Sequence, residues 1–198
     1  MVNVAVLVSG GGTNLQAILD AKKAGELPNV NLALVIASKP DVFALKRAEK
    51  AGVATEVVAR KAFADTEAFN DALLATLQKN QIEIIVLAGF LSILSEKIIR
   101  TYPEKIINVH PSLIPSFCGA GFYGLKVHEA ALARGVKVTG ATVHFVNEIP
   151  DGGRILLQEA VAVLPGDTPE ILQQRVMTQA EWKILPRALA LITAQRQS

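Results

Sequence analysis

Hydrophobic residues in the first part of the chain form short runs that alternate with segments of helical periodicity. Val2–Val8 and residues 31–37 are apolar, β-branched runs, as expected of buried strands. Between them, Leu15, Ile18 and Leu19 fall on one helical face, which predicts a helix from Leu15 to about Ala24. This alternation is typical of a parallel sheet that is covered by helices.

The same alternation continues to residue 110. The pattern predicts a helix at about 42–51, a strand at 53–58, a helix starting at Asp65 or Thr66, a strand at 82–90, a short helix and a strand at 105–110. Residues 82–90 are almost uniformly apolar, as expected of a central strand with both faces covered. The sequence therefore predicts a doubly wound α/β fold, in which ligands bind beyond the carboxyl ends of the strands.

The last third of the chain follows another pattern. Residues 140–146 and 155–163 are β segments separated by EIPDGGR, which predicts an antiparallel pair joined by a tight turn. Thr168-Pro169 is a typical helix start, and Pro186 is expected to kink or break the long helix that follows. The expected fold is a doubly wound, mostly parallel sheet with antiparallel strands toward the C-terminus, in a single domain spanning residues 1–198.

Composition narrows the class of protein. Of 198 residues, 51% are hydrophobic and 19% charged, with a net charge of +2 and one cysteine, Cys118. The charge shows no footprint for nucleic acid or a membrane surface, and one cysteine excludes an intrachain disulfide framework. No stretch approaches the ~18 apolar residues of a membrane span, and no basic segment precedes the first apolar run. We expect a cytoplasmic protein without nucleic-acid or membrane partners.

Residues 9–14, SGGGTN, connect the first predicted strand to the first predicted helix. Consecutive glycines let backbone amides converge on an anion, and a helix N-terminus adds its dipole. Leu15 stands where a dinucleotide fingerprint has its third glycine, and no Gly-Lys-Ser/Thr follows as in a P-loop. The glycines alone leave two interpretations open, an anion site or a tight turn without a ligand.

Asn108 and His110 end a strand that is otherwise apolar, in the sequence KIINVHPSLIP. They are two residues apart, so both side chains face the same side of a strand. Asn108 or His110 alone would indicate only a polar residue that is hydrogen-bonded at the end of a strand. Combined with Asp151 of the DGG turn, they make a poor metal site but suit oxyanion stabilisation with proton transfer. Ser112 and Cys118 lie in no motif of a catalytic nucleophile.

Five segments occur in a distinctive order between residue 2 and about residue 190: SGGGTNLQAI, LAGFLSILS, INVHPSLIP, GATVHFVNE and DGGRILLQ. In order and spacing they resemble the phosphoribosylglycinamide formyltransferases, or glycinamide ribonucleotide transformylases. HPSLIP followed about forty residues later by a DGG turn is specific to formyltetrahydrofolate-using transferases. The SGGGTN loop resembles that of the ribonucleotide enzymes among them.

The resemblance implies an enzyme of purine synthesis that formylates the amino group of glycinamide ribonucleotide. Its co-substrate would be 10-formyltetrahydrofolate, without a metal, and we expect a monomer or homodimer with only small-molecule partners. The implied catalytic trio is Asn108, His110 and Asp151, with Asp151 raising the pKa of His110. The residues implied at the ribonucleotide phosphate and ribose are Gly12, Thr13, Asn14 and Glu181. Those implied at the folate are Leu91, Ser92, Ile93, Leu94, Asn147, Glu148, Ile149 and Pro150, with Asn108 and Asp151.

The chain departs from this family pattern in a few places. Thr66 and Ser92 stand where some relatives have arginines that contact folate. Glu181 is followed by Trp182 where many relatives have histidine, and one residue is inserted just before it. Trp182 is expected in the core. These differences concern the ends of the two substrates and leave the catalytic trio unchanged.

Three other functions stay open at this level. A 10-formyltetrahydrofolate hydrolase would share the trio but pass the formyl group to water; such enzymes usually carry an N-terminal regulatory domain, whereas this chain starts at its first strand. A methionyl-tRNA formyltransferase would need a further C-terminal domain and a basic surface. A folate- or nucleotide-binding module would not need an intact trio. His128 and His144 are assigned to structure, on a helix face and on a strand.

Overall fold

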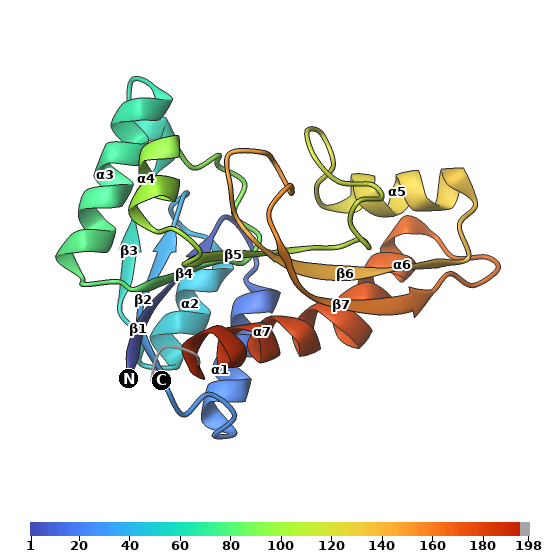
Figure 1. The fold of residues 1–198 in the computed structure, drawn as a ribbon, viewed down its shortest axis with the longest axis horizontal. Coiled ribbons are helices and arrows are strands. Elements are labelled where there is room, and N and C mark those ends of the chain that lie inside the picture. The colour runs from blue at the N-terminus through green and yellow to red at the C-terminus, as the bar shows by residue number, and fades with distance from the viewer. Residues whose placement is uncertain (195–198) are drawn as a thin grey trace.

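One seven-stranded sheet runs through the computed structural model, which describes residues 1–194 (Figure 1). The strand order is β3-β2-β1-β4-β5-β6-β7. Five strands are parallel: β1 (Val2–Val8), β2 (Val30–Ala37), β3 (Thr55–Val57), β4 (Ile84–Leu87) and β5 (Ile106–His110). β6 (Val138–Phe145) is antiparallel to β5, and β7 (Ile155–Ala162) is antiparallel to β6. The mostly parallel sheet with antiparallel C-terminal strands is thus confirmed.

Helices cover both faces of this sheet (Figure 1). α3 (Thr66–Lys79) and α4 (Glu96–Thr101) lie on one face, and α1 (Thr13–Lys23), α2 (Phe43–Lys50) and α7 (Trp182–Ala194) lie on the other. Residues of β1 alternate between the two cores: Val4 and Val6 point to the second set of helices, Ala5 and Leu7 to the first. Alternate residues of the strand point to opposite faces, and both faces are covered. All positions from 4 to 8 are therefore apolar, which explains the unbroken apolar run in the sequence.

Shorter elements complete the chain. They are a 3₁₀ turn η1 (Arg60–Ala62), helix α5 (Leu125–Arg134), helix α6 (Pro169–Val176) and a π-helical turn η2 (Met177–Glu181). The predicted helix starts are confirmed, since the carboxylate of Asp65 accepts from the backbone N–H of Ala68 at 2.8 Å and Thr168 caps α6. No helix within residues 1–194 has the length and apolar character needed to cross a membrane.

The predicted break at Pro186 is wrong in position. Pro186 lies inside α7, and the long C-terminal helix is interrupted one turn earlier by η2. A proline ring clashes with the carbonyl four residues before it, which here belongs to Trp182, the first residue of α7. The interruption is a π turn of five residues that ends at Glu181.

The predicted tight turn between β6 and β7 is also wrong. The connection is a loop over residues 146–154, closed at its base where the N–H of Phe145 donates to the carbonyl of Arg154 at 2.9 Å. At its tip the N–H of Gly152 donates to the carbonyl of Ile149 at 2.9 Å, and Asp151 has a positive φ of 55°. The added length lets Asp151 reach away from its own hairpin, toward the end of β5.

Candidate active site

Asn108, His110 and Asp151 meet in one cleft. β5 supplies Asn108 and His110, and the loop after β6 supplies Asp151. Nδ1 of His110 lies 3.5 Å from Oδ2 of Asp151, and the two side chains are only 5% and 14% exposed. The cleft has a volume of about 700 Å³ and opens beyond the carboxyl ends of the parallel strands, where such folds bind ligands. The structure therefore brings together the three groups that the sequence singles out.

His144 joins this group, although its sequence position indicates only a strand. Nε2 of His144 lies 3.5 Å from Oδ1 of Asp151 and 3.3 Å from Nδ2 of Asn108. Its Nδ1 lies 2.7 Å from the carbonyl oxygen of Phe145, which can only accept, so Nδ1 carries a proton. A neutral His144 accepts from Asn108, and a protonated one donates to Asp151. Its ring thus links the amide and the carboxylate of the cleft.

Two opposing effects act on the titrating groups of the cleft. Burial raises the pKa of Asp151, but hydrogen bonds from His144 and from the N–H of Gly119, with the nearby His110, outweigh it and lower the pKa. For His110, burial lowers the pKa more than the Phe117 carbonyl and Asp151 raise it. Asp151 thus raises the pKa of His110, as expected, but the net shift is downward because desolvation of the imidazolium dominates.

The loop that follows β5 closes over the cleft. Nε2–H of His110 donates to the carbonyl of Phe117 at 2.8 Å, and the N–H of Gly119 donates to Oδ2 of Asp151 at 2.8 Å. Phe117 itself has a left-handed φ of 49°. Two groups of the trio are thus bonded to the backbone of one loop.

At the other end of the cleft, Asn14 and Glu181 form a buried pair. Nδ2 of Asn14 donates to Oε2 of Glu181 at 2.7 Å, while Oδ1 of Asn14 has no partner within the described part of the chain. The pair lies at the first turn of α1, whose N–H groups and dipole favour an anion. Of the four residues implied at the ribonucleotide, Asn14 and Glu181 line this cleft, whereas Gly12 and Thr13 do not.

Gly12 has a conformational role at this point. It caps α1 with φ +72°, and a Cβ at this position would lie 2.6 Å from Cβ of Ala44. Close packing of the SGGGTN loop against α2 thus needs glycine at position 12. At Gly11 no atom lies within 4 Å of such a Cβ, and φ is not left-handed.

We expect Gly12→Ala to lower the free energy of unfolding by about 2–4 kcal/mol, from the left-handed backbone and the overlap with Ala44. Gly11→Ala is the matched control and should change it by less than about 1 kcal/mol, since the site is open. Urea denaturation of both variants measures this. Equal stabilities would show that the loop shifts freely away from α2.

Glu181 carries a cost in stability. Burial raises the pKa of its carboxyl from 4.5 to about 6, against the lowering effect of Asn14. A raised carboxyl pKa means that the folded state holds the proton more tightly than the unfolded chain, so stability falls as pH rises from about 4.5 to about 6.

We therefore expect Glu181→Gln to be more stable than the wild type by about 2 kcal/mol at pH 8 and nearly equal to it at pH 4. Glutamine keeps an oxygen for Nδ2 of Asn14 and removes the buried charge. Thermal or urea unfolding at both pH values measures the difference. A variant less stable than wild type at pH 8 would contradict this reading of the pair.

The residues implied at the folate surround the trio from two loops. Residues 90 and 92–94 after β4 and residues 146–151 of the other loop line a smaller hollow of about 150 Å³ that shares Asn108 and Asp151 with the cleft. Ile93 and Ile149 are 77% and 66% exposed at its edge, as an apolar rim for a flat ligand. Leu94 is 7% exposed and packs mainly into the core beside α3. Each implied residue lines the cleft or this hollow: Leu91, Ser92, Ile93, Leu94, Asn108, Asn147, Glu148, Ile149, Pro150 and Asp151.

The arrangement of potential metal ligands within residues 1–194 bears on the kind of site. No group of three or more His, Cys, Asp and Glu side chains there is arranged to hold a metal ion. The two imidazoles near Asp151 instead contact an amide and backbone carbonyls. The donor set is that of a hydrogen-bonding, proton-handling site.

Comparison with known proteins agrees with this geometry. Residues 2–189 match the family described as formyl transferase. Phosphoribosylglycinamide formyltransferase of Haemophilus influenzae is 40% identical over 196 residues, which cover 99% of this chain and 89% of that protein. The trifunctional purine biosynthetic protein adenosine-3 of Bos taurus is 45% identical over 191 residues, or 96% of this chain but 18% of that protein. The chain thus spans under a fifth of that longer relative.

Solved structures give the same result. Glycinamide ribonucleotide transformylase 1 from Symbiobacterium toebii superposes with a TM-score of 0.92 at 41% identity, covering 99% of this chain and 89% of that one. Phosphoribosylglycinamide formyltransferase from Brucella melitensis has a TM-score of 0.87 at 43% identity, covering 97% and 95%. The class is therefore defined: the chain belongs to the formyl transferase family. Within that family it falls among the phosphoribosylglycinamide formyltransferases.

Proposed function

We propose that the protein transfers the formyl group of 10-formyltetrahydrofolate to the amino group of glycinamide ribonucleotide. The products are N-formylglycinamide ribonucleotide and tetrahydrofolate, in purine biosynthesis in the cytoplasm. One observation carries the proposal: an amide, an imidazole and a carboxylate converge in a cleft between an anion-favouring helix start and an apolar-rimmed hollow. The family supports the same reaction class.

The geometry suits attack of an amine on a formyl carbon. As the N–C bond forms, the formyl oxygen becomes negative, and Asn108 and His110 can donate to it from the same face of β5. One N–H of the Asn108 amide bonds to a neutral His144, which leaves the second for the oxygen. The proton lost by the attacking nitrogen must reach N10 of the folate as the C–N10 bond breaks, and His110 is placed to pass it.

Asp151 acts through its charge in this scheme. It lies between the rings of His110 and His144, 3.5 Å from a nitrogen of each. Burial lowers the pKa of His110, and the negative charge of Asp151 opposes that lowering. When the loop leaves Nε2 of His110, that nitrogen is free to bond to the reacting atoms. Asn14 and Glu181, with the start of α1, would hold the ribonucleotide, and the hollow beside residues 91–94 and 147–150 would hold the folate ring.

The experiment is a two-substrate assay that measures release of tetrahydrofolate from 10-formyltetrahydrofolate, with and without glycinamide ribonucleotide. Release that requires the ribonucleotide, with one formylated product for each folate released, is the expected result. Equal release without the ribonucleotide would indicate a hydrolase instead. Binding of the folate without any turnover would indicate a binding module.

A further inference from the structure

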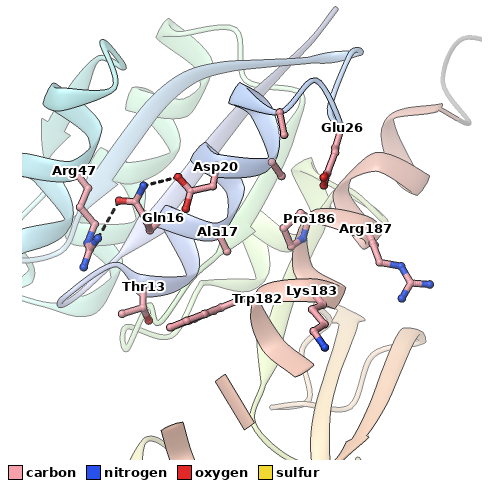
Figure 2. Close-up of a pocket in the computed structure, with 12 residues that line it drawn as sticks. Thr13, Gln16, Ala17, Asp20, Glu26, Arg47, Trp182, Lys183, Pro186 and Arg187 are labelled. Atoms are coloured by element: carbon pink, nitrogen blue, oxygen red, sulfur yellow. Dashed lines mark hydrogen bonds between the residues drawn. The ribbon is translucent and has the colours of Figure 1, made fainter. Parts of the chain in front are cut away.

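A groove of about 650 Å³ lies between α1 and α7, outside the proposed active site (Figure 2). Ala17 and Ala21 of α1 and Pro186 of α7 form an apolar floor. Trp182 lies across one end of it, beside Thr13, and is half-buried rather than part of the core as its sequence suggested. The groove therefore offers an aromatic surface next to small apolar side chains.

The groove and the cleft share a wall but no lining residue. Asn14 and Glu181 face the cleft, whereas their sequence neighbours Thr13 and Trp182 face the groove. Successive residues of a helix point in directions about 100° apart, so each pair divides between the two cavities. A ligand in the groove would thus contact Thr13 and Trp182, the sequence neighbours of the buried pair, without entering the cleft.

Charges at the rim of the groove are separated by sign. Lys183 and Arg187, four residues apart on α7, are exposed and make no ion pair within residues 1–194. Asp20 and Glu26 lie across from them, at α1 and just after it (Figure 2). Arg47 is already engaged, since its Nε donates to the carbonyl of Gly11 at 2.8 Å. An occupant must therefore be anionic at one end and offer donors at the other.

We infer that the groove between α1 and α7 is a second small-molecule site, for a nucleoside monophosphate. Its base stacks on the indole of Trp182, and its phosphate bonds to Lys183 and Arg187. Ribose hydroxyl and base amino groups donate to Asp20 and Glu26. Stacking of a base on an aromatic side chain contributes about 1–3 kcal/mol, and cavities of roughly 300–1,000 Å³ suit ligands of this size. The groove site itself does not depend on which reaction the cleft performs.

The test uses intrinsic fluorescence, because Trp182 is the only tryptophan of the chain. AMP and GMP are titrated into the full-length protein, with adenosine and inorganic phosphate as separate arms. We expect a saturable change with the nucleotides and a much weaker one with adenosine or phosphate alone. The double variant Lys183→Glu, Arg187→Glu should bind AMP about ten- to a hundredfold more weakly, since hydrogen bonds from charged groups are lost.

Lys79→Glu, an exposed charge reversal at the end of α3 on the opposite face of the sheet, is the matched control and should bind AMP as the wild type does. No saturable change with either nucleotide would overturn the inference. So would equal AMP affinity in the double variant, or full competition between AMP and glycinamide ribonucleotide, which would place AMP in the cleft.

Discussion

Replacing Asp151 by asparagine is expected to lower the turnover number by about two to four decades. Asparagine keeps the size of the side chain and an oxygen for the N–H of Gly119, but it removes the negative charge that lies 3.5 Å from both imidazoles. The fold should survive, because Asp151 sits on a loop and is not part of either core. The effect should therefore appear in turnover and not in the amount of folded protein.

The pH profile gives a second readout of the same change. Burial lowers the pKa of His110, and the Phe117 carbonyl and Asp151 offset part of this lowering. Without the carboxylate one of these two offsetting effects is lost, so the pKa of His110 falls further. The rate should fall at high pH as His110 loses its proton. This falling limb of the pH profile should therefore move to lower pH in Asp151→Asn. Steady-state kinetics across pH for both proteins measures this shift.

Two comparisons make the result specific. Asp71→Asn removes an exposed carboxylate paired with Lys97 on the surface and should leave turnover unchanged. His110→Ala should lose about as much as Asp151→Asn, and the double variant should lose much less than the product of the two, since the residues act as one unit. If Asp151→Asn keeps the turnover number and the pH profile of the wild type, Asp151 has only a structural role in the turn.

Removing the amide of Asn108 is the second large effect. Asn108→Ala should lower the turnover number by about two to three decades, the usual loss when one donor to an oxyanion is deleted. The Michaelis constant for the ribonucleotide should change little, because the negative charge on the formyl oxygen exists only during reaction. A matching rise in this constant with unchanged turnover would show that Asn108 serves binding alone.

Asn108→Asp separates donation from shape. Aspartate has the same size but no N–H, and it places a second carboxylate beside Asp151, so it should be at least as inactive as alanine. Unfolding in urea checks that both variants keep the stability of the wild type within about 1–3 kcal/mol, the range for a lost buried hydrogen bond. Activity of the aspartate variant within tenfold of wild type would contradict the proposed donor role.

The sheet was predictable because its signal is local. Apolar runs bounded by glycine and capping residues identify β1, β2 and β4, and Asp65 and Thr168 identify two helix starts. The π turn at 177–181 could not be predicted, because the sequence shows a proline at 186 but no local signal within residues 177–181. The sequence predicts a tight turn where the structure has the long loop 146–154. A DGG turn has the same local pattern at the tip of a loop as in a tight hairpin.

The site was predictable for a different reason. Asn108 and His110 stand out because they interrupt an apolar strand, and Asp151 because it begins the only DGG in the chain. His144 was missed, since its partner depends on strand register: it pairs with Asn108 across the antiparallel β5–β6 ladder. Register is fixed by contacts between distant segments, and no local pattern reports it. Burial lowers the pKa of His110 more than Asp151 raises it, and the extent of burial cannot be measured from sequence.

Two backbone groups of the protein occupy hydrogen-bonding atoms of the proposed catalytic residues. The Phe117 carbonyl accepts from His110, and the Gly119 N–H donates to Asp151. Any atom that takes a hydrogen bond from Nε2 of His110 must first take the place of the Phe117 carbonyl. A hydrogen bond from His110 to a reactant thus replaces the one to Phe117. The observed affinity then reflects only the difference in free energy between these two bonds. The imidazole of His110 and the carboxylate of Asp151 are both bonded to the backbone of this loop in the structure, so engaging His110 through Nε2 requires a rearrangement near Phe117.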